Sequence, residues 1–151
     1  MKKTNKKGFT LVELLAVIVI LGVLLLIAVP AIQNVINSSK KQAFESQAKL
    51  LVENVETMLS AANNKPTEEC YLQTGNVKLE RGALNDDAKK GYIKVTPDST
   101  SDTGYKITIS IGDGTYSVSD KKLTDISGSA TRDGAVPELG TGKTLCEFYS
   151  E

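Results

Sequence analysis

The sequence predicts an α+β fold in which a long N-terminal helix, transmembrane in its first half, packs by its second half on a small antiparallel sheet of three or four strands. Three observations support this prediction. Residues 14–29 contain no charged or polar side chain. Apolar or small residues recur every three or four positions across residues 44–62, which is the period of one helical face. Residues 105–111 alternate strictly between apolar and polar side chains, which is the period of a half-buried strand.

The composition of the chain excludes several classes of function. Lysine and arginine total 18, as do aspartate and glutamate, so the net charge indicates no nucleic-acid or membrane-surface partner. The charge is unevenly placed, because residues 1–7 hold four lysines and no acid. Histidine, the commonest general base and transition-metal ligand, is absent. We therefore expect a chain that is not an enzyme and that holds no cofactor or metal.

Residues 9–32 are the predicted membrane-spanning segment. The apolar run, extended at both ends, supplies the roughly 20 residues needed to cross a bilayer core. Because lysines precede it, the positive-inside rule places residues 1–8 in the cytoplasm and the remainder of the chain outside. Glu13 is the one acid in the segment, and an acid within a membrane span is by default a functional residue.

Two interpretations of this segment follow from its charge and hydrophobicity alone, without reference to a known family. In the first, it is an ordinary secretory signal peptide that is cut at the small-residue stretch Val29-Pro30-Ala31, so that Ile32 begins the mature chain. Glu13 interrupts the start of such a signal, and the apolar run is long. In the second, the segment is a plain single-span anchor, which leaves Glu13 and the Gly8–Phe9 pair unexplained.

The third interpretation is based on a motif. The stretch reads Lys7-Gly8-Phe9-Thr10-Leu11-Val12-Glu13-Leu14. It resembles the prepilin signature, or class III signal peptide, of type IV pilins and pseudopilins, with a short basic leader, Gly8 before Phe9, and an acid at the fifth residue after that junction. The resemblance is close over residues 1–36, including Pro30. It implies that a prepilin peptidase removes residues 1–8 by cutting between Gly8 and Phe9, and then methylates the amino group of Phe9.

The resemblance also implies a function and a set of partners. The chain would be a structural subunit of a type IV pilus-like extracellular filament that serves adhesion, twitching motility or DNA uptake. Before assembly it would be a single-pass protein of the cytoplasmic membrane. The implied partners are the prepilin peptidase, a platform protein, an assembly ATPase, further copies of the chain and sibling minor pilins; DNA or a host surface stays open. The alternatives are a pseudopilin of a secretion system and a secreted or membrane-anchored binding domain with an ordinary signal peptide.

Glu13 has a physical role on this interpretation. An unpaired carboxylate is costly among packed apolar helices, and the Phe9 ammonium of a neighbouring subunit is a natural partner for it. Such a pair would form only in the correct axial register, and buried ionic groups are better attested as specificity devices than as sources of stability. We therefore expect Glu13 to govern subunit assembly.

The predicted helix runs from Phe9 to Ala62. Pro30 removes an intrahelical hydrogen bond and should kink or loosen the helix, and Gly22 is a second irregular position that also allows close helix approach in a membrane. Residues 33–62 form the amphipathic half. Its apolar side contains Phe44, Ala48, Leu51, Val52, Val55, Met58, Leu59 and Ala62, and its polar side contains Lys49, Glu53, Asn54 and Glu56. We expect the apolar side to cover a sheet.

Residues 63–151 supply this sheet. Strands are predicted at residues 91–96, 105–111 and 115–119, with a hairpin between the last two. A short fourth strand is predicted near Leu123–Ile126, a short helix at residues 79–88 and a surface loop at residues 127–144.

Cys70 and Cys146 are the two cysteines. In an exported protein they most simply form one disulfide, whereas in the cytosol they would be two buried thiols. The outward orientation favours the disulfide, which would pin the C-terminal loop to the connection between helix and sheet. The family commonly has both cysteines near its C-terminus, so the wide spacing here departs from its pattern.

Two further patterns carry little weight. Residues 140–144 contain Gly-Lys-Thr, but Glu138 occupies the place of the first glycine of a phosphate-binding loop. A second group suggests calcium, as in some pseudopilins: Asp113, Asp120, Asp125 and Asp133. These acids lack EF-hand spacing, so we expect solvated loop residues.

Overall fold

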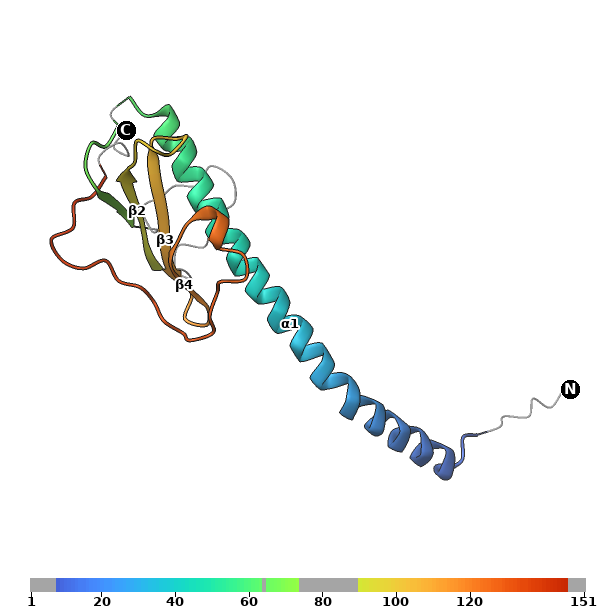
Figure 1. Ribbon diagram of the computed structural model, residues 1–151. Coiled ribbons are helices and arrows are strands. Elements are labelled where there is room, and N and C mark those ends of the chain that lie inside the picture. The colour runs from blue at the N-terminus through green and yellow to red at the C-terminus, as the bar shows by residue number, and fades with distance from the viewer. Residues whose placement is uncertain (1–7, 64, 74–89, 147–151) are drawn as a thin grey trace, which may run out of the picture. The chain divides into compact units, whose positions relative to one another are not determined.

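The computed structural model describes residues 8–63, 65–73 and 90–146. Its elements are α1 (Leu11–Ala61), β1 (Cys70–Gln73), β2 (Lys90–Pro97), β3 (Tyr105–Gly112), β4 (Ser117–Lys121) and a 3₁₀ helix, η2 (Leu123–Asp125). The four strands form one antiparallel sheet in the order β1-β2-β3-β4. Figure 1 shows the C-terminal half of α1 lying along one face of this sheet. The predicted α+β fold is confirmed.

The chain divides into two compact units, which we call the N-terminal unit (residues 1–39) and the head unit (residues 40–151). Helix α1 runs through both, beginning two residues after Phe9 and ending one residue before Ala62. Pro30 lies inside α1, and the helix is unbroken on both sides of it. The long helix predicted by the apolar period is therefore one continuous element.

The core of the head unit lies between α1 and the sheet. Helix α1 contributes Phe44, Ala48, Leu51, Val52, Val55 and Leu59, all buried, with Met58 partly buried beside them. The strands contribute Leu72, Ile93, Val95, Ile107, Ile109, Ile111 and Val118. The rings of Phe44 and Tyr116 face each other with centroids 6.2 Å apart. The apolar side of α1 and the apolar face of the sheet, both predicted from the sequence, thus bury each other.

Strands β2 and β3 lie where the sequence predicts them, and β4 begins slightly later. The Asp113 carboxylate accepts hydrogen bonds from the main-chain amides of Thr115 (2.8 Å) and Tyr116 (2.7 Å). These bonds keep both residues in the turn, so β4 begins at Ser117. The pairing of β3 with β4 is irregular between Ile109 and Ile111, as expected for a β-bulge.

The predicted fourth strand near Leu123–Ile126 is wrong. Residues 123–125 form η2 instead, and the Asp125 amide closes the turn by donating to the Lys122 carbonyl at 3.0 Å. The fourth strand is β1, which pairs antiparallel with β2 from Cys70↔Val95 to Gln73↔Tyr92. The helix predicted at residues 79–88 lies outside the described residues.

Residues 130–146 form a segment that we call the C-terminal strap. The strap contains most of the predicted surface loop, residues 127–144, and it pairs with both outer strands of the sheet. Ser117 of β4 exchanges two main-chain hydrogen bonds with Thr131, each 2.9 Å long. Tyr71 of β1 donates to the Thr144 carbonyl at 2.9 Å and accepts from the Cys146 amide at 3.0 Å. The predicted disulfide between Cys70 and Cys146 is present at this second contact.

Candidate functional site: the N-terminal apolar segment

Helix α1 begins with a reciprocal pair of hydrogen-bonding residues. The Glu13 carboxylate accepts from the main-chain amide of Thr10 at 2.9 Å and from the Thr10 hydroxyl at 2.8 Å. In return, the Glu13 amide donates to the Thr10 hydroxyl at 3.3 Å. This arrangement is a capping box, which satisfies amides at the helix start that have no partner inside the helix. The acid singled out by the sequence is thus the N-terminal cap partner of α1.

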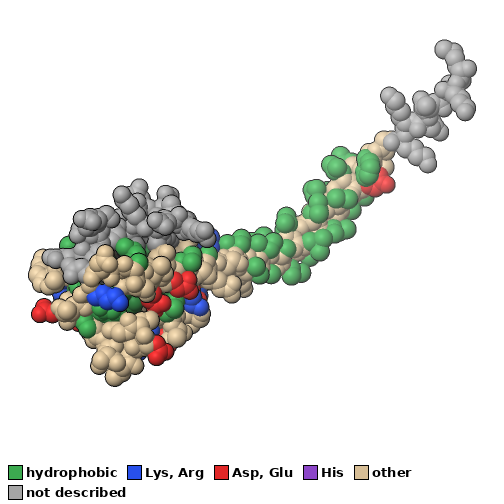
Figure 2. All heavy atoms as spheres, turned by 90° about the horizontal axis from the view of Figure 1, so that it is seen from above, with side chains coloured by type: hydrophobic (Ala, Val, Ile, Leu, Met, Phe, Trp, Pro, Cys, Tyr) green, Lys and Arg blue, Asp and Glu red, His purple; other side chains and the backbone are tan. Residues whose placement is uncertain are grey.

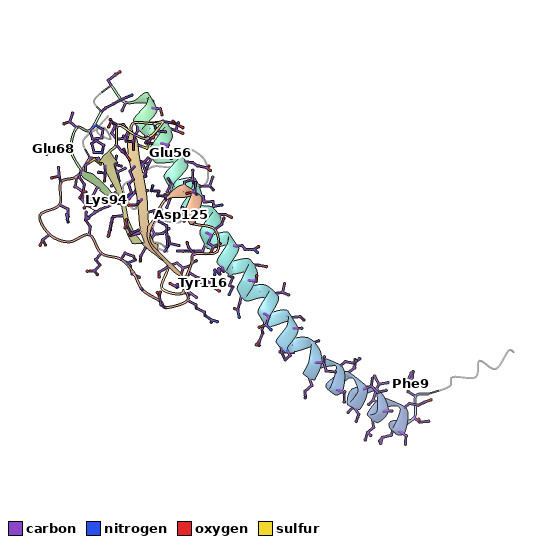
Figure 3. The ribbon with its side chains drawn as sticks, in the orientation of Figure 1. Phe9, Glu56, Glu68, Lys94, Tyr116 and Asp125 are labelled. Atoms are coloured by element: carbon purple, nitrogen blue, oxygen red, sulfur yellow. A yellow bond between two sulfur atoms is a disulfide. The ribbon has the colours of Figure 1, made fainter. Side chains whose placement is uncertain are left out.

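Phe9 lies just before this cap, at the N-terminal end of α1 (Figure 3). Its side chain is 83% exposed. One helical turn separates it from Glu13, so the ring, the Gly8–Phe9 peptide bond and the carboxylate occupy the same end of the helix. The structure describes Gly8 and Phe9 as part of the segment before α1. Both residues are exposed, so the peptide bond between them is open to solvent.

The N-terminal unit presents apolar side chains on all sides of α1. Every large apolar side chain from Phe9 to Ile36 is between 46% and 83% exposed. Figure 2 shows this part of the helix covered by hydrophobic side chains. Helix α1 is long and apolar enough here to cross a membrane. A helix that is apolar all round needs either lipid or other apolar helices as its surroundings.

Gly22 and Pro30 lie within this apolar part of α1. A Cβ atom added at Gly22 would meet nothing within 4 Å, so no contact within the described chain requires glycine there. Pro30 cannot donate a main-chain hydrogen bond to the preceding turn. Their effect on helix shape stays a prediction.

The disulfide end of the strap is held by a group of polar and aromatic side chains. The Tyr71 hydroxyl donates to the Glu69 carboxylate, which also pairs with the Lys94 ammonium at 2.9 Å. Hydrogen bonding by Tyr71, and next by Lys94, lowers the pKa of Glu69. The Lys143 ammonium lies 5.2 Å from the centre of the Tyr71 ring, which is within cation–π distance. The Lys143 contact joins the strap to Tyr71 of β1, and the pair of Glu69 and Lys94 joins the residue before β1 to β2.

The Gly-Lys-Thr sequence at residues 140–144 belongs to this fastening. Lys143 faces Tyr71, and the Thr144 carbonyl accepts the Tyr71 amide. In the part of the chain that the structure describes, these residues lead directly into the sheet-edge contact of Leu145 and Cys146 with Tyr71, where a phosphate-binding loop would lead into a helix.

The aspartates considered for calcium do not act together as ligands, since Asp113 and Asp133 have separate hydrogen-bonding roles. Asp113 caps the β3–β4 turn, and Asp133 accepts from Ser117, Thr131 and Ala135. Within residues 8–63, 65–73 and 90–146, no three His, Cys, Asp or Glu side chains form a group that could hold a metal ion.

Two contacts in the structure were not predicted from the sequence. The Thr-x-x-Glu spacing of Thr10 and Glu13 is a known signal for a capping box and could have been recognised. Glu45 is the second case. It is 7% exposed, although an acid at that position of an amphipathic helix suggests a solvated side chain.

The fold and the apolar segment define a class of protein: a membrane-length N-terminal helix that carries a small α+β head. Comparisons with known proteins agree with this class. A family model described as the prokaryotic N-terminal methylation motif matches residues 3–29. The chain is 30% identical to a type IV major fimbrial protein FimA of Dichelobacter nodosus over 131 residues, which are 81% of this chain and 83% of that relative. The chain belongs to the type IV pilin family.

Two other FimA proteins of Dichelobacter nodosus match over a shorter stretch. They are 37% and 36% identical over 70 residues, or 46% of this chain. The chain aligns with only 42% and 44% of their lengths. No solved structure matches the chain.

Proposed function

We propose that the chain is a non-enzymatic structural subunit of a type IV pilus-like extracellular filament, assembled through the apolar half of α1. The observation that carries this proposal is the exposed apolar surface of the N-terminal unit, which ends in Phe9, Thr10 and Glu13. The similarity to a major fimbrial protein over 81% of this chain supports it. The head unit, by contrast, buries its own core and needs no partner to do so.

The apolar segment can serve two successive states. In a bilayer, lipid chains cover the exposed side chains, and Glu13 at the helix start is satisfied by Thr10. In a filament, neighbouring helices cover the same side chains. The ammonium of a processed Phe9 then becomes a charged partner for Glu13 of another subunit. This ion pair offsets the cost of removing the Glu13 carboxylate from water only when the two subunits are in the correct register.

The same proposal assigns processing and location. A prepilin peptidase cuts between Gly8 and Phe9 and methylates Phe9. The subunit is stored as a single-pass protein of the cytoplasmic membrane and then passes to the cell surface with the help of a platform protein and an assembly ATPase. Further copies and minor pilins are its neighbours in the filament.

The first experiment determines the mature N-terminus and the assembled state. Filaments sheared from cells that express the chain are imaged by electron microscopy, and their subunit is analysed by mass spectrometry. We expect filaments whose subunit begins at a methylated Phe9. A mature chain that begins at Ile32 and forms no filaments would show an ordinary secreted domain and refute the proposal.

The second experiment tests Glu13. We expect Glu13→Ala and Glu13→Val to reduce filament yield strongly while the subunit still accumulates in the membrane. Glu53→Ala, on the exposed side of α1 in the head unit, is the matched control and should assemble normally. Normal filament yield from both Glu13 variants would exclude the register role.

A further inference from the structure

Glu45 is a buried residue of α1 whose carboxylate binds a loop more than 80 residues later in the chain. Its two oxygens each accept one main-chain hydrogen bond, from Gly128 at 2.9 Å and from Ala130 at 3.0 Å. The side chain is 10% exposed. A buried carboxylate of this kind needs donors, and the loop supplies one for each oxygen.

Two lysines reinforce the same contact. Lys41 donates to the Gly128 carbonyl at 3.2 Å, and Lys49 donates to the Ser127 hydroxyl at 2.6 Å. Lys41, Glu45 and Lys49 are four residues apart, so they lie on one side of α1. We call these three side chains and residues 127–130 the Glu45 clamp. Hydrogen bonds of fixed direction set the register of the loop on the helix, whereas apolar contacts alone would allow it to slide.

The clamp lies where the head unit first holds α1. Counted from the N-terminus, the first buried residues of the helix are Phe44 and Glu45. Everything before them in the described helix is exposed or half-buried. A helix without tertiary packing is marginal in water, and free energies of local opening rise where side chains become buried. The clamp therefore coincides with a step in the local stability of α1.

We propose that the Glu45 clamp sets the boundary on α1 between a part that can lose and regain helical structure alone and a part that unfolds only with the head. Unwinding that begins on the N-terminal side stops at residues 41–45, because further opening must break the hydrogen bonds of the Gly128 and Ala130 amides to Glu45. If the chain assembles as proposed above, the clamp lets the apolar half of α1 adapt to its neighbours in the filament without disturbing the head.

The test is residue-resolved hydrogen exchange of main-chain amides by NMR, on the full chain in detergent micelles. In Glu45→Ala we expect the amides of Gly128, Ala130 and residues 41–49 to exchange at least tenfold faster. The amides of Ile93 and Ile109, in the centre of the sheet, should keep their wild-type rates. Glu53→Ala is the control on the same helix and should change none of these amides.

Glu45→Gln provides a gentler variant. Its amide keeps one oxygen acceptor and replaces the other by a donor, so we expect faster exchange at one of the two loop amides and an intermediate change on α1. Unchanged exchange at residues 41–49 in both variants would overturn the proposal. So would a uniform acceleration that includes Ile93 and Ile109, since it would show a general loss of stability. Neither result depends on filament formation, so failure of the proposed function would be seen separately in the electron micrographs.

Discussion

Thr10 and Glu13 satisfy each other across the first turn of α1, with the amide and the hydroxyl of Thr10 converging on one carboxylate oxygen at 2.9 and 2.8 Å. Glu13 therefore has a partner within its own chain before any neighbour arrives. On the proposed function, assembly through Glu13 would exchange or extend these bonds. The acid is thus held in a defined position at the helix start.

Removing the Thr10 hydroxyl should loosen this start. Loss of an N-cap side chain typically costs about 0.5–2 kcal/mol, so in Thr10→Ala we expect faster amide exchange at residues 11–14 in micelles. Thr10→Ser keeps the hydroxyl and should behave like the wild type. Equal exchange in the alanine and serine variants would show that the cap contributes nothing there.

Replacing both cysteines by serine should lower the stability of the head unit. The disulfide joins residues 76 positions apart, and closing a loop of that length restricts the unfolded chain by roughly 4–5 kcal/mol in the chain-entropy model. We expect a clearly lower urea midpoint for the Cys70→Ser, Cys146→Ser double variant. Reduction of the wild type should give a similar midpoint. A double variant that unfolds at the wild-type midpoint would contradict this prediction.

Asp133 should make the strap contact depend on pH. The Ser117 hydroxyl, the Ala135 amide and the Thr131 hydroxyl donate to its carboxylate and lower its pKa. A carboxyl whose folded pKa is depressed stabilises the fold above its unfolded pKa, about 3.9, and this stabilisation is lost as the pH falls through the folded value. Asp133→Asn should therefore lower Tm at pH 7, and the difference from the wild type should shrink at acidic pH. A difference in Tm that is constant between pH 7 and pH 2 would rule out the carboxylate as its cause.

Gly112 should resist substitution because the strap passes directly beside it. A Cβ atom at this position would lie 2.0 Å from the Ala135 carbonyl oxygen, so Gly112→Ala must displace one of two backbones. We expect a loss of stability typical of overpacking, about 1–3 kcal/mol, in urea unfolding. Gly140→Ala, which meets nothing within 4 Å, is the matched control. Equal midpoints for the two variants would show that the strap yields freely at Ala135.

Much of the fold could be predicted because its largest elements have long and regular patterns. The apolar run and the spacing from Phe44 onward predict α1, and the alternation that ends at Ile111 predicts β3. Strand β1 has four residues, too few for a periodic signal, and its pairing with β2 decides its structure. Leu123–Ile126 gave the opposite error, since a local turn hydrogen bond outcompetes strand formation there.

The site could be predicted only as far as local sequence determines it. Gly8, Phe9 and Glu13 stand within one motif, so their association is visible in the sequence. The donors to Glu45 lie 83 and 85 residues away, and no local pattern links positions that far apart. Its burial depends on how the loop after η2 returns to the helix, which only the folded chain shows.

The C-terminal strap limits edge-to-edge pairing between the sheets of different molecules. Unpaired outer strands are natural sites of aggregation, because their free amides and carbonyls accept strands of other molecules. Here a single segment engages both outer strands, through Thr131 at β4 and through Thr144 and Cys146 at β1. In the proposed filament, where heads would lie side by side at high local concentration, this pairing would keep their sheets from joining edge to edge. Contacts between neighbouring heads then fall to side chains and loops, whose chemistry can diverge without altering the backbone that supports them.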